Sequence, residues 1–333
     1  MNIQKQVLAT LKGCYSCNSI ELDGRTNILL ASEGENACLA WSAPDYKQSH
    51  TVWEGPGGTM SIVPIPGTNG EFLAVQKFFR MFDWEEAKVV HVRPQANGGY
   101  EVTDILQLPY VHRFDLLTVG GRHYFIGCTL ATKKATKEDW SSPGKIWVGE
   151  YTGVGPMSIT VLKDGLTKNH GYSRLDRGGA LSGLVTCEQG AFEVVPPQAP
   201  DGEWSVTQFM DWPISDISAI DIDGDGELEF ATIEPFHGQY FRVYKKVGGV
   251  LTCITDGVGV DQDDGWHSCS PIEKGEHLPA LCSARIRCCP VHPAEHRDHR
   301  HGCRTSATGR AGHQRLLRRV PRLAERELPH PRG

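Results

Sequence analysis

The sequence predicts an all-β protein. Short runs rich in β-branched and aromatic residues alternate with glycine- and proline-containing turns along most of its 333 residues. No window of about 11–18 residues shows a sustained helical period of apolar side chains. Frequent short strands without helices are typical of a sandwich, a barrel or a propeller. The hydrophobic content of 39% and charged content of 22% match an ordinary globular protein, and no apolar run approaches the roughly 20 residues of a membrane span.

The expected strands follow from this alternation, because each run ends at a cluster of turn residues. In chain order they cover residues 27–32, 37–42, 50–54, 60–64, 72–76, 88–92, 100–105, 114–119, 123–127, 145–150 and 158–162.

An internal repeat decides between the three folds. Four segments share the order strand, turn, second strand, polar loop and outer strand. The second strands of these segments cover 71–76, 123–128, 180–186 and 228–233. Their starts lie about 50 residues apart, which is the scale of a four-stranded propeller blade. The repeat therefore predicts an all-β propeller.

Five blades of four strands are recognisable. They are expected at residues 20–57, 58–109, 110–166, 167–213 and 214–258. A sixth blade begins near residues 263–267 and stops where the strand pattern ends. Because a propeller needs its last blade to close the ring, the ring is expected to be incomplete at the C-terminus.

A charge discontinuity separates the propeller, expected over residues 1–281, from a tail at 282–333. The chain has a net charge of −6, yet the tail holds twelve arginines, no lysine and four acidic residues. Its charge would suit a basic nucleic-acid-binding arm. A zinc site could also be drawn from its cysteines and histidines. The candidate ligands are Cys288, Cys289, His292, His296 and Cys303.

A third interpretation of the tail is an out-of-frame translation. The tail has no interleaved aromatic residues to support a nucleic-acid-binding arm, and its cysteines and histidines have no regular spacing to support a zinc site. An arginine-only basic composition with abundant Pro, His, Cys and Ala is typical of GC-rich DNA read in a wrong frame. The composition favours this third interpretation, so the tail is not expected to be natively structured and no nucleic-acid partner is expected.

The stretch from Asp221 to Glu229 is the strongest motif in the chain. It places carboxylates at loop positions one, three, five and nine and glycines at four and six. Ca²⁺ takes six to eight oxygen ligands at about 2.3–2.6 Å, and glycine allows the tight turn that brings such ligands together. An EF-hand would need Glu at position twelve, where Thr232 stands, and helices where strands are expected. The stretch therefore predicts a metal-bound β-hairpin loop, with a solvated acidic turn as the alternative.

This loop resembles the calcium loop of FG-GAP/VCBS-type β-propeller repeats, Asp-x-Asp-x-Asp-Gly-x-x-Asp/Glu. The resemblance implies a structural Ca²⁺ held by one loop of one blade. Its ligands here would be the side chains of Asp221, Asp223, Asp225 and Glu229 and the carbonyl oxygen of Glu227. The loop joins the first two strands of its blade, so it is expected on the face opposite the ligand funnel of a propeller.

Polar residues are expected to converge at the funnel, which the blade connections and the second-to-third strand loops build. They are His112, Arg113, His170, Arg174, Glu188, Glu234, His237 and His267. Four histidines and two glutamates suit a second divalent metal or acid–base catalysis. The alternative is that these are hydrogen-bonded scaffold histidines. His170 and His237 are the preferred catalytic candidates, because each lies beside a glycine in a loop directed at the axis.

The run from Glu234 to Tyr244 is also similar to the propeller of aldos-2-ulose dehydratases, lyases that remove water from oxidised sugars. The similarity implies a histidine that abstracts a proton beside a metal-polarised carbonyl.

Two functions remain open from the sequence. One is a calcium-stabilised propeller that acts as a binding or interaction scaffold; the other is a metal-assisted lyase acting on a carbohydrate. The expected partner is a small molecule such as a carbohydrate, or a protein, and not a membrane. The N-terminus shows no secretory signal, and eleven cysteines without one indicate reduced thiols, so a cytoplasmic location is expected.

Overall fold

The computed structural model describes residues 7–34, 37–78, 84–153 and 155–255, together with the backbone of 258–259, 269–272 and 280–283. The chain divides into two units, 1–288 and 289–333, and every described residue lies in the first unit. The described residues form strands and turns only, so none of them belongs to a helix that could cross a membrane. The predicted tail at 282–333 lies outside the described residues, apart from the backbone of its first two positions.

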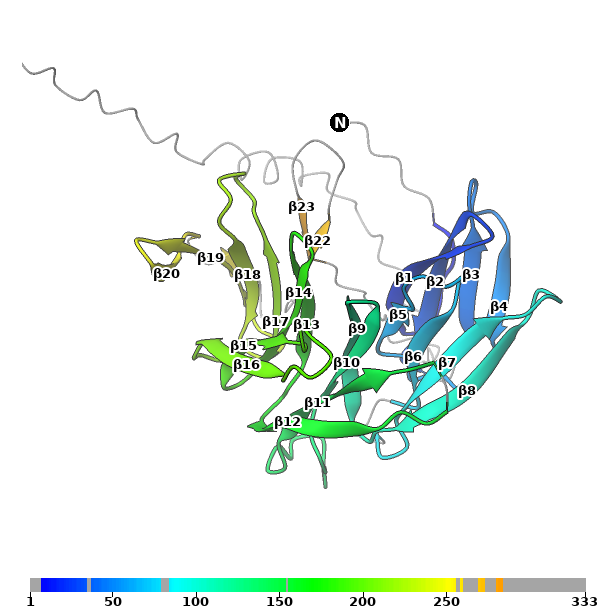
Figure 1. Ribbon diagram of the computed structural model, residues 1–333, viewed down its shortest axis with the longest axis horizontal. Helices are drawn as coiled ribbons and strands as arrows, with labels where there is room; N and C mark the ends of the chain where they lie inside the picture. Colours follow the sequence, from blue (N-terminus) through cyan, green and yellow to red (C-terminus); the bar gives the residue numbers. More distant parts are fainter. Residues whose placement is uncertain are drawn as a thin grey trace, which may run out of the picture. The chain divides into compact units, whose positions relative to one another are not determined.

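Five antiparallel sheets, each of four consecutive strands, make up the described fold (Figure 1). The first sheet contains β1 (Cys14–Leu22), β2 (Arg25–Ser32), β3 (Cys38–Ser42) and β4 (Ser49–Trp53). The second contains β5 (Ile62–Pro64), β6 (Phe72–Gln76), β7 (Lys88–Pro94) and β8 (Tyr100–Gln107). The third contains β9 (Val111–Val119), β10 (Arg122–Thr129), β11 (Gly144–Tyr151) and β12 (Ile159–Leu166).

The last two sheets repeat this order. The fourth contains β13 (Gly171–Arg177), β14 (Ala180–Cys187), β15 (Gly190–Val195) and β16 (Ser205–Met210). The fifth contains β17 (Asp216–Ile220), β18 (Glu229–Glu234), β19 (Tyr240–Val247) and β20 (Val250–Cys253), and β21 (Val258–Gly259) also pairs with β19. A separate hairpin joins β22 (Cys269–Ile272) to β23 (Ala280–Ser283).

The first strands of the sheets lie next to one another. β5 contacts β1 and β9, and β13 contacts β9 and β17. β22 in turn lies against β17, in the position that the first strand of a further blade would take. Each sheet is therefore a blade with its first strand innermost, and the fold is the all-β propeller of four-stranded blades that the repeat predicts. The predicted start of a sixth blade at 263–267 lies outside the described residues.

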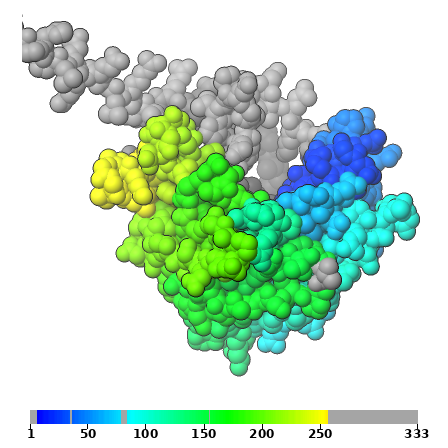
Figure 2. Space-filling model, viewed as in Figure 1, coloured from blue at the N-terminus to red at the C-terminus, as the bar shows by residue number. Residues whose placement is uncertain are grey.

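Burial follows the strand order within a blade. Every residue of β6 and β18 is buried, whereas most of β12 and β20 is exposed or only partly buried. In Figure 2 the β19–β20 hairpin, in yellow, lies at the surface, and Val247 and Val250 beside its turn are 56% and 67% exposed. Second strands are buried because they pair on both edges and pack on both faces between neighbouring blades.

The core consists of apolar layers between successive blades. The layer between the second and third blades holds Leu73, Leu116 and Phe125, none of which has any exposed surface. Other layers join the first blade to the second, the third to the fourth and the fourth to the fifth. Each blade therefore depends on its neighbours for burial.

The first blade begins earlier than the sequence predicts. Its innermost strand β1 starts at Cys14, whereas the prediction placed the blade at 20–57. β1 is rich in small polar residues, and Ile20 is its only large aliphatic side chain that is buried. Hydrogen bonding to β2, not apolar patterning, defines this strand.

Replacing Leu73 with alanine tests how far one layer supports the fold. Leu73→Ala is expected to lower the free energy of unfolding by about 2–5 kcal/mol, since it leaves a cavity between two blades. The matched control is Val161→Ala on the outer strand β12, where the side chain is 43% exposed and a change within about 0.5 kcal/mol is expected. Urea unfolding of both variants gives the comparison, and equal losses would contradict the layered core.

Candidate functional site

The acidic loop connects β17 to β18 and is organised by its own first residue. The carboxylate of Asp221 accepts backbone N–H groups from Gly224 at 2.6 Å, Asp225 at 3.1 Å and Gly226 at 2.9 Å. Gly224 and Gly226 have φ angles of 77° and 88°, in the left-handed region that glycine adopts without strain. Glu229 closes the loop by accepting the N–H of Ile222 at 2.6 Å. The turn is thus shaped by carboxylates that satisfy its amide groups.

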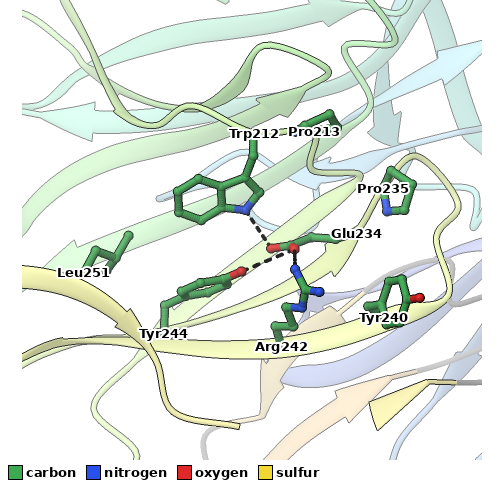
Figure 3. Close-up of a pocket in the computed structure, with 8 residues that line it drawn as sticks. All are labelled: Trp212, Pro213, Glu234, Pro235, Tyr240, Arg242, Tyr244 and Leu251. Atoms are coloured by element: carbon green, nitrogen blue, oxygen red, sulfur yellow. Dashed lines mark hydrogen bonds and ion pairs between the residues drawn. The ribbon is translucent and has the colours of Figure 1, made fainter. Parts of the chain in front are cut away.

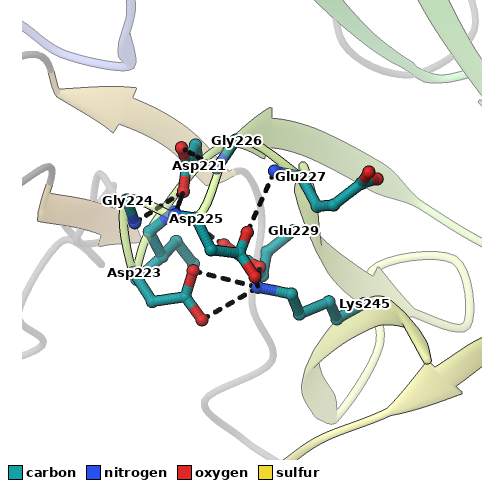
Figure 4. A network of polar contacts seen from close by, with 9 residues as sticks. Asp221, Asp223, Gly224, Asp225, Gly226, Glu227, Glu229 and Lys245 are labelled. Carbon is teal, nitrogen blue, oxygen red and sulfur yellow. Dashed lines mark hydrogen bonds and ion pairs between the residues drawn. The ribbon is translucent and has the colours of Figure 1, made fainter.

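A lysine that the sequence analysis did not single out lies among these carboxylates (Figure 4). Lys245 on β19 places its Nζ 2.8 Å from Asp223, 2.7 Å from Asp225 and 2.7 Å from Glu229. These contacts, led by the hydrogen bond to Asp223, raise the pKa of Lys245. The same lysine lowers the pKa of Asp225.

Strand register explains this position. Tyr244 lies opposite Phe230 in the β18–β19 ladder, so Lys245 is one step beyond the last pair and faces the loop end of β18. A lysine on the third strand at this step is the signal that could have identified the contact from the sequence.

The loop offers the donor atoms that Ca²⁺ prefers. Oxygens of Asp221, Asp223 and Asp225 lie within 4.8 Å of one another, the one such group of three potential metal ligands found among the described residues. Glu229 is 2% exposed, and its Oε1 has charge contact with Lys245 but no hydrogen-bond partner. Hard carboxylate oxygens on a tight turn fit Ca²⁺. The ammonium group of Lys245, however, already contacts three of the four carboxylate side chains.

At the other end of the fifth blade, three of the predicted funnel histidines come together. The rings of His112 and His170 have centroids 4.5 Å apart, and Nε2 of His237 lies 3.3 Å from Nε2 of His170. His112 Nδ1 is 3.3 Å from the carbonyl oxygen of His170, and His170 Nδ1 is 3.1 Å from that of Ser215. The hydroxyl of Tyr15 lies 3.4 Å from His112 Nε2. This histidine cluster links the beginnings of the first, third, fourth and fifth blades.

The hydrogen bonds assign a tautomer to each ring. Nδ1 of His112 and of His170 carries a proton, because each faces a carbonyl oxygen. His170 Nε2 is then an acceptor for the Nε2 proton of His237. His112 is 4% exposed and His170 is 1% exposed, so both rings are buried and their polar atoms have partners.

Aromatic rings and cations border this cluster. Phe236 stacks on His237 at a centroid distance of 4.1 Å, and Trp140 contacts Phe236 at 5.5 Å. The buried ammonium of Lys134 lies 3.2 Å from the centroid of Trp140. Burial lowers the pKa of Lys134. Aromatic and basic residues therefore surround the histidine cluster.

His237 lies in a desolvated and positively charged part of this shell. Loss of hydration beside Phe236 and His170, with the positive charges of Lys137, Lys168 and Arg113, lowers the pKa of His237 to about 4.

The remaining predicted funnel residues have other partners. Glu188 forms an ion pair with Lys168. Arg174 pairs with the buried carboxylate of Asp115, 2.9 Å from its Nε.

Arg113 stays beside the histidine cluster, with Nη1 donating to the carbonyl of Met60 at 2.8 Å and the guanidinium over the ring of Tyr15. Glu234 binds Trp212, Arg242 and Tyr244. His267 lies outside the described residues.

Glu234 is the centre of a polar network in an open groove on the fifth blade (Figure 3). Trp212 donates to its Oε1 at 2.9 Å, Arg242 to its Oε2 at 2.7 Å and Tyr244 to its Oε2 at 3.3 Å. Thr232 donates to Oε1 at 2.7 Å. Burial, with the charge of Glu234 beside it, raises the pKa of Tyr244 to about 12. The carboxylate is buried and fully hydrogen-bonded.

The groove has a volume of about 520 Å³, within the range of small-molecule sites. Its walls are Trp212, Pro213, Glu234, Pro235, Tyr240, Arg242, Tyr244 and Leu251. Tyr240 is 42% exposed, and the guanidinium carbon of Arg242 lies 5.0 Å from the centroid of its ring. The groove thus presents aromatic surface beside the guanidinium of Arg242, one nitrogen of which is hydrogen-bonded to Glu234.

Fold and site together define a β-propeller protein of four-stranded blades, with an acidic loop, a histidine cluster and a groove on its fifth blade. No protein-family model and no curated protein matches the chain. The FG-GAP/VCBS resemblance therefore stays a prediction.

Among solved structures, the chain is similar to an alpha-L-arabinofuranosidase from Lactobacillus brevis at 12% identity and a TM-score of 0.42, over 77% of this chain and 94% of that one. It is similar to a thermostable family-43 glycoside hydrolase at 10% and 0.38, over 75% and 95%. Kuenenia stuttgartiensis hydrazine synthase matches at 11% and 0.42, over 72% and 70%. At these identities and TM-scores the likenesses assign neither a family nor an activity.

The lowered pKa of His237 leads to a prediction about acid stability. With a folded-state pKa of about 4 and an unfolded value of 6.5, the unfolded state takes up the proton first as pH falls from 6.5 towards 4. Stability from neutral His237 is complete above pH 6.5 and declines through this window. His237→Gln is therefore expected to show a smaller fall in melting temperature across it. NMR titration gives the direct check, and a His237 midpoint near 6.5 would contradict the assignment.

Proposed function

We propose that the protein is a non-catalytic binding scaffold, a propeller whose fifth blade carries a Ca²⁺-binding loop and a separate small-molecule groove. The observation that carries the proposal is the burial and hydrogen bonding of the histidines. His112 and His170 are buried and bound to backbone carbonyls, and His237 contacts His170, so these rings act as links between blades. Buried rings whose nitrogens are hydrogen-bonded to the backbone or to each other suit a structural role better than acid–base catalysis.

The groove supplies a better place for a ligand than the histidine cluster. It is open, and its aromatic rings lie beside Arg242, whose side chain is 35% exposed. Flat aromatic surface favours the apolar face of a ring-shaped ligand, and a guanidinium favours a carboxylate. The ligand class that fits is a small ring compound that carries a carboxylate.

In the loop, Ca²⁺ would take oxygens of Asp221, Asp223, Asp225 and Glu229 and the carbonyl of Glu227. Its contribution would be to neutralise the carboxylates and fix the β17–β18 hairpin. The role is structural, since none of the loop residues lines the groove.

Ligand binding in the groove can be measured through Trp212. Titration with a sugar carboxylate such as glucuronate is expected to change tryptophan fluorescence and raise the melting temperature, whereas glucose should have a weaker effect. Tyr240→Ala removes exposed ring surface and is expected to weaken binding about tenfold, the effect of losing one aromatic contact of roughly 1–1.5 kcal/mol.

Val247→Ala is the matched control, because Val247 is 56% exposed on the same strand and lies outside the groove. Equal affinities for glucuronate in the two variants would reject the groove as the binding site.

A metal-assisted lyase is a second candidate, favoured by the convergence of the histidines from three blades. His237 also has a φ of 49°, in a region that residues other than glycine seldom adopt and that is enriched at functional sites. In such a lyase, neutral His237 would remove a proton beside a carbonyl. The imidazolium would then give this proton to the hydroxyl on the next carbon, which leaves as water while the C=C bond forms.

The enzyme hypothesis predicts an unsaturated carbonyl product from a 2-keto sugar. Its formation would be followed by ultraviolet absorbance, with divalent metal added, and His237→Gln should abolish it. The scaffold proposal predicts no product with either protein. A product lost in His237→Gln but retained in Tyr240→Ala would therefore replace the scaffold proposal with the enzyme.

A further inference from the structure

The acidic loop already contains a cation of the protein's own. We propose that Lys245 is the resident counter-cation of the Asp221–Glu229 loop, so that the loop is neutralised without metal and Ca²⁺ binds only by displacing the lysine. This inference rests on the Ca²⁺ loop proposed above and concerns how that site is controlled.

The first step is geometric. Lys245 comes from β19 and not from the loop, yet its Nζ is within 2.9 Å of carboxylate oxygens from Asp223, Asp225 and Glu229. Its side chain is 13% exposed. The ammonium donates hydrogen bonds to both oxygens of Asp223 and makes ion-pair contacts with Asp225 and Glu229 (Figure 4). The contact is a convergent site and not a single surface ion pair.

The second step concerns burial and charge. The loop has five carboxylates in nine residues, and Glu229 is 2% exposed at the start of a fully buried strand. A buried carboxylate needs a positive partner or strong hydrogen bonds. Glu229 Oε2 has the N–H of Ile222, whereas Oε1 has only the charge of Lys245. Removing the ammonium without replacing it leaves this oxygen uncompensated.

The third step is competition. Ca²⁺ needs the same oxygens of Asp223, Asp225 and Glu229, and an ammonium cannot remain at contact distance from a divalent ion without strong repulsion. The lysine stem is flexible enough to turn out to solvent. Asp221 is engaged with three loop amides and can keep its position. If the lysine-out conformer holds about a tenth of the population, the apparent Ca²⁺ affinity is about tenfold weaker than the intrinsic one.

The experiment compares Lys245→Met with Lys246→Met. Both variants lose one positive charge from adjacent positions of β19, but Lys246 is exposed and has no ion pair with the loop among the described contacts. Thermal melts in EDTA and in CaCl₂, and calorimetric titration with CaCl₂, are measured for the wild type and both variants.

In EDTA, Lys245→Met is expected to melt lower than the wild type and Lys246→Met. CaCl₂ should restore its melting temperature, and its Ca²⁺ affinity should exceed the wild-type value about tenfold. An unchanged melting temperature of Lys245→Met in EDTA would overturn the counter-cation role. Equal Ca²⁺ affinities in Lys245→Met and the wild type would overturn the displacement.

Failure of the Ca²⁺ loop itself gives a different result. If neither protein binds Ca²⁺ but Lys245→Met still melts lower in EDTA, the calcium site is rejected while the lysine remains the counter-cation. Should Lys245→Met not fold, Lys245→Gln, which keeps hydrogen-bond donors but not the charge, replaces it in the same comparison. It is expected to bind Ca²⁺ more tightly than the wild type, and equal affinities would overturn the displacement.

Discussion

The hydrogen bonds between buried histidines and backbone carbonyls are the interaction on which the inner part of the propeller depends. His112 reaches the carbonyl of His170 in the next blade, and His170 reaches that of Ser215 in the blade after it. The carbonyl of Ser215 also accepts the hydroxyl of Thr186 at 3.0 Å, so two side chains of the fourth blade bind the backbone at the start of the fifth. Apolar layers then fill the space between sheets that these bonds hold together.

Much of this fold could be predicted from the sequence, because its signals are local. Blade boundaries follow from turns and alternating strands, and the acidic loop follows from nine consecutive residues. Strand β1 was not predicted, since small polar residues such as Ser16 and Asn18 are held by pairing and not by an apolar pattern. Tertiary pairing overrides weak strand propensity at such positions.

For the site, the sequence could predict only which loops lie at the same end of the propeller. That rule brought His112, His170 and His237 together, but it could not give the directions of their ring nitrogens. Glu234 departs from the group because β18 turns its side chain towards Trp212 and Arg242. Lys245 was missed because its partners lie sixteen or more residues away and are reached only through strand register.

Charged residues also favour one register between β18 and β19. β18 is buried along its whole length and has a carboxylate at each end, Glu229 and Glu234. Both find their cation on β19, at Lys245 and Arg242 respectively. A slip of one residue would turn alternate side chains to the opposite face and leave two buried carboxylates without positive charge. The two ion pairs therefore favour a single register between β18 and β19 as the fifth blade folds.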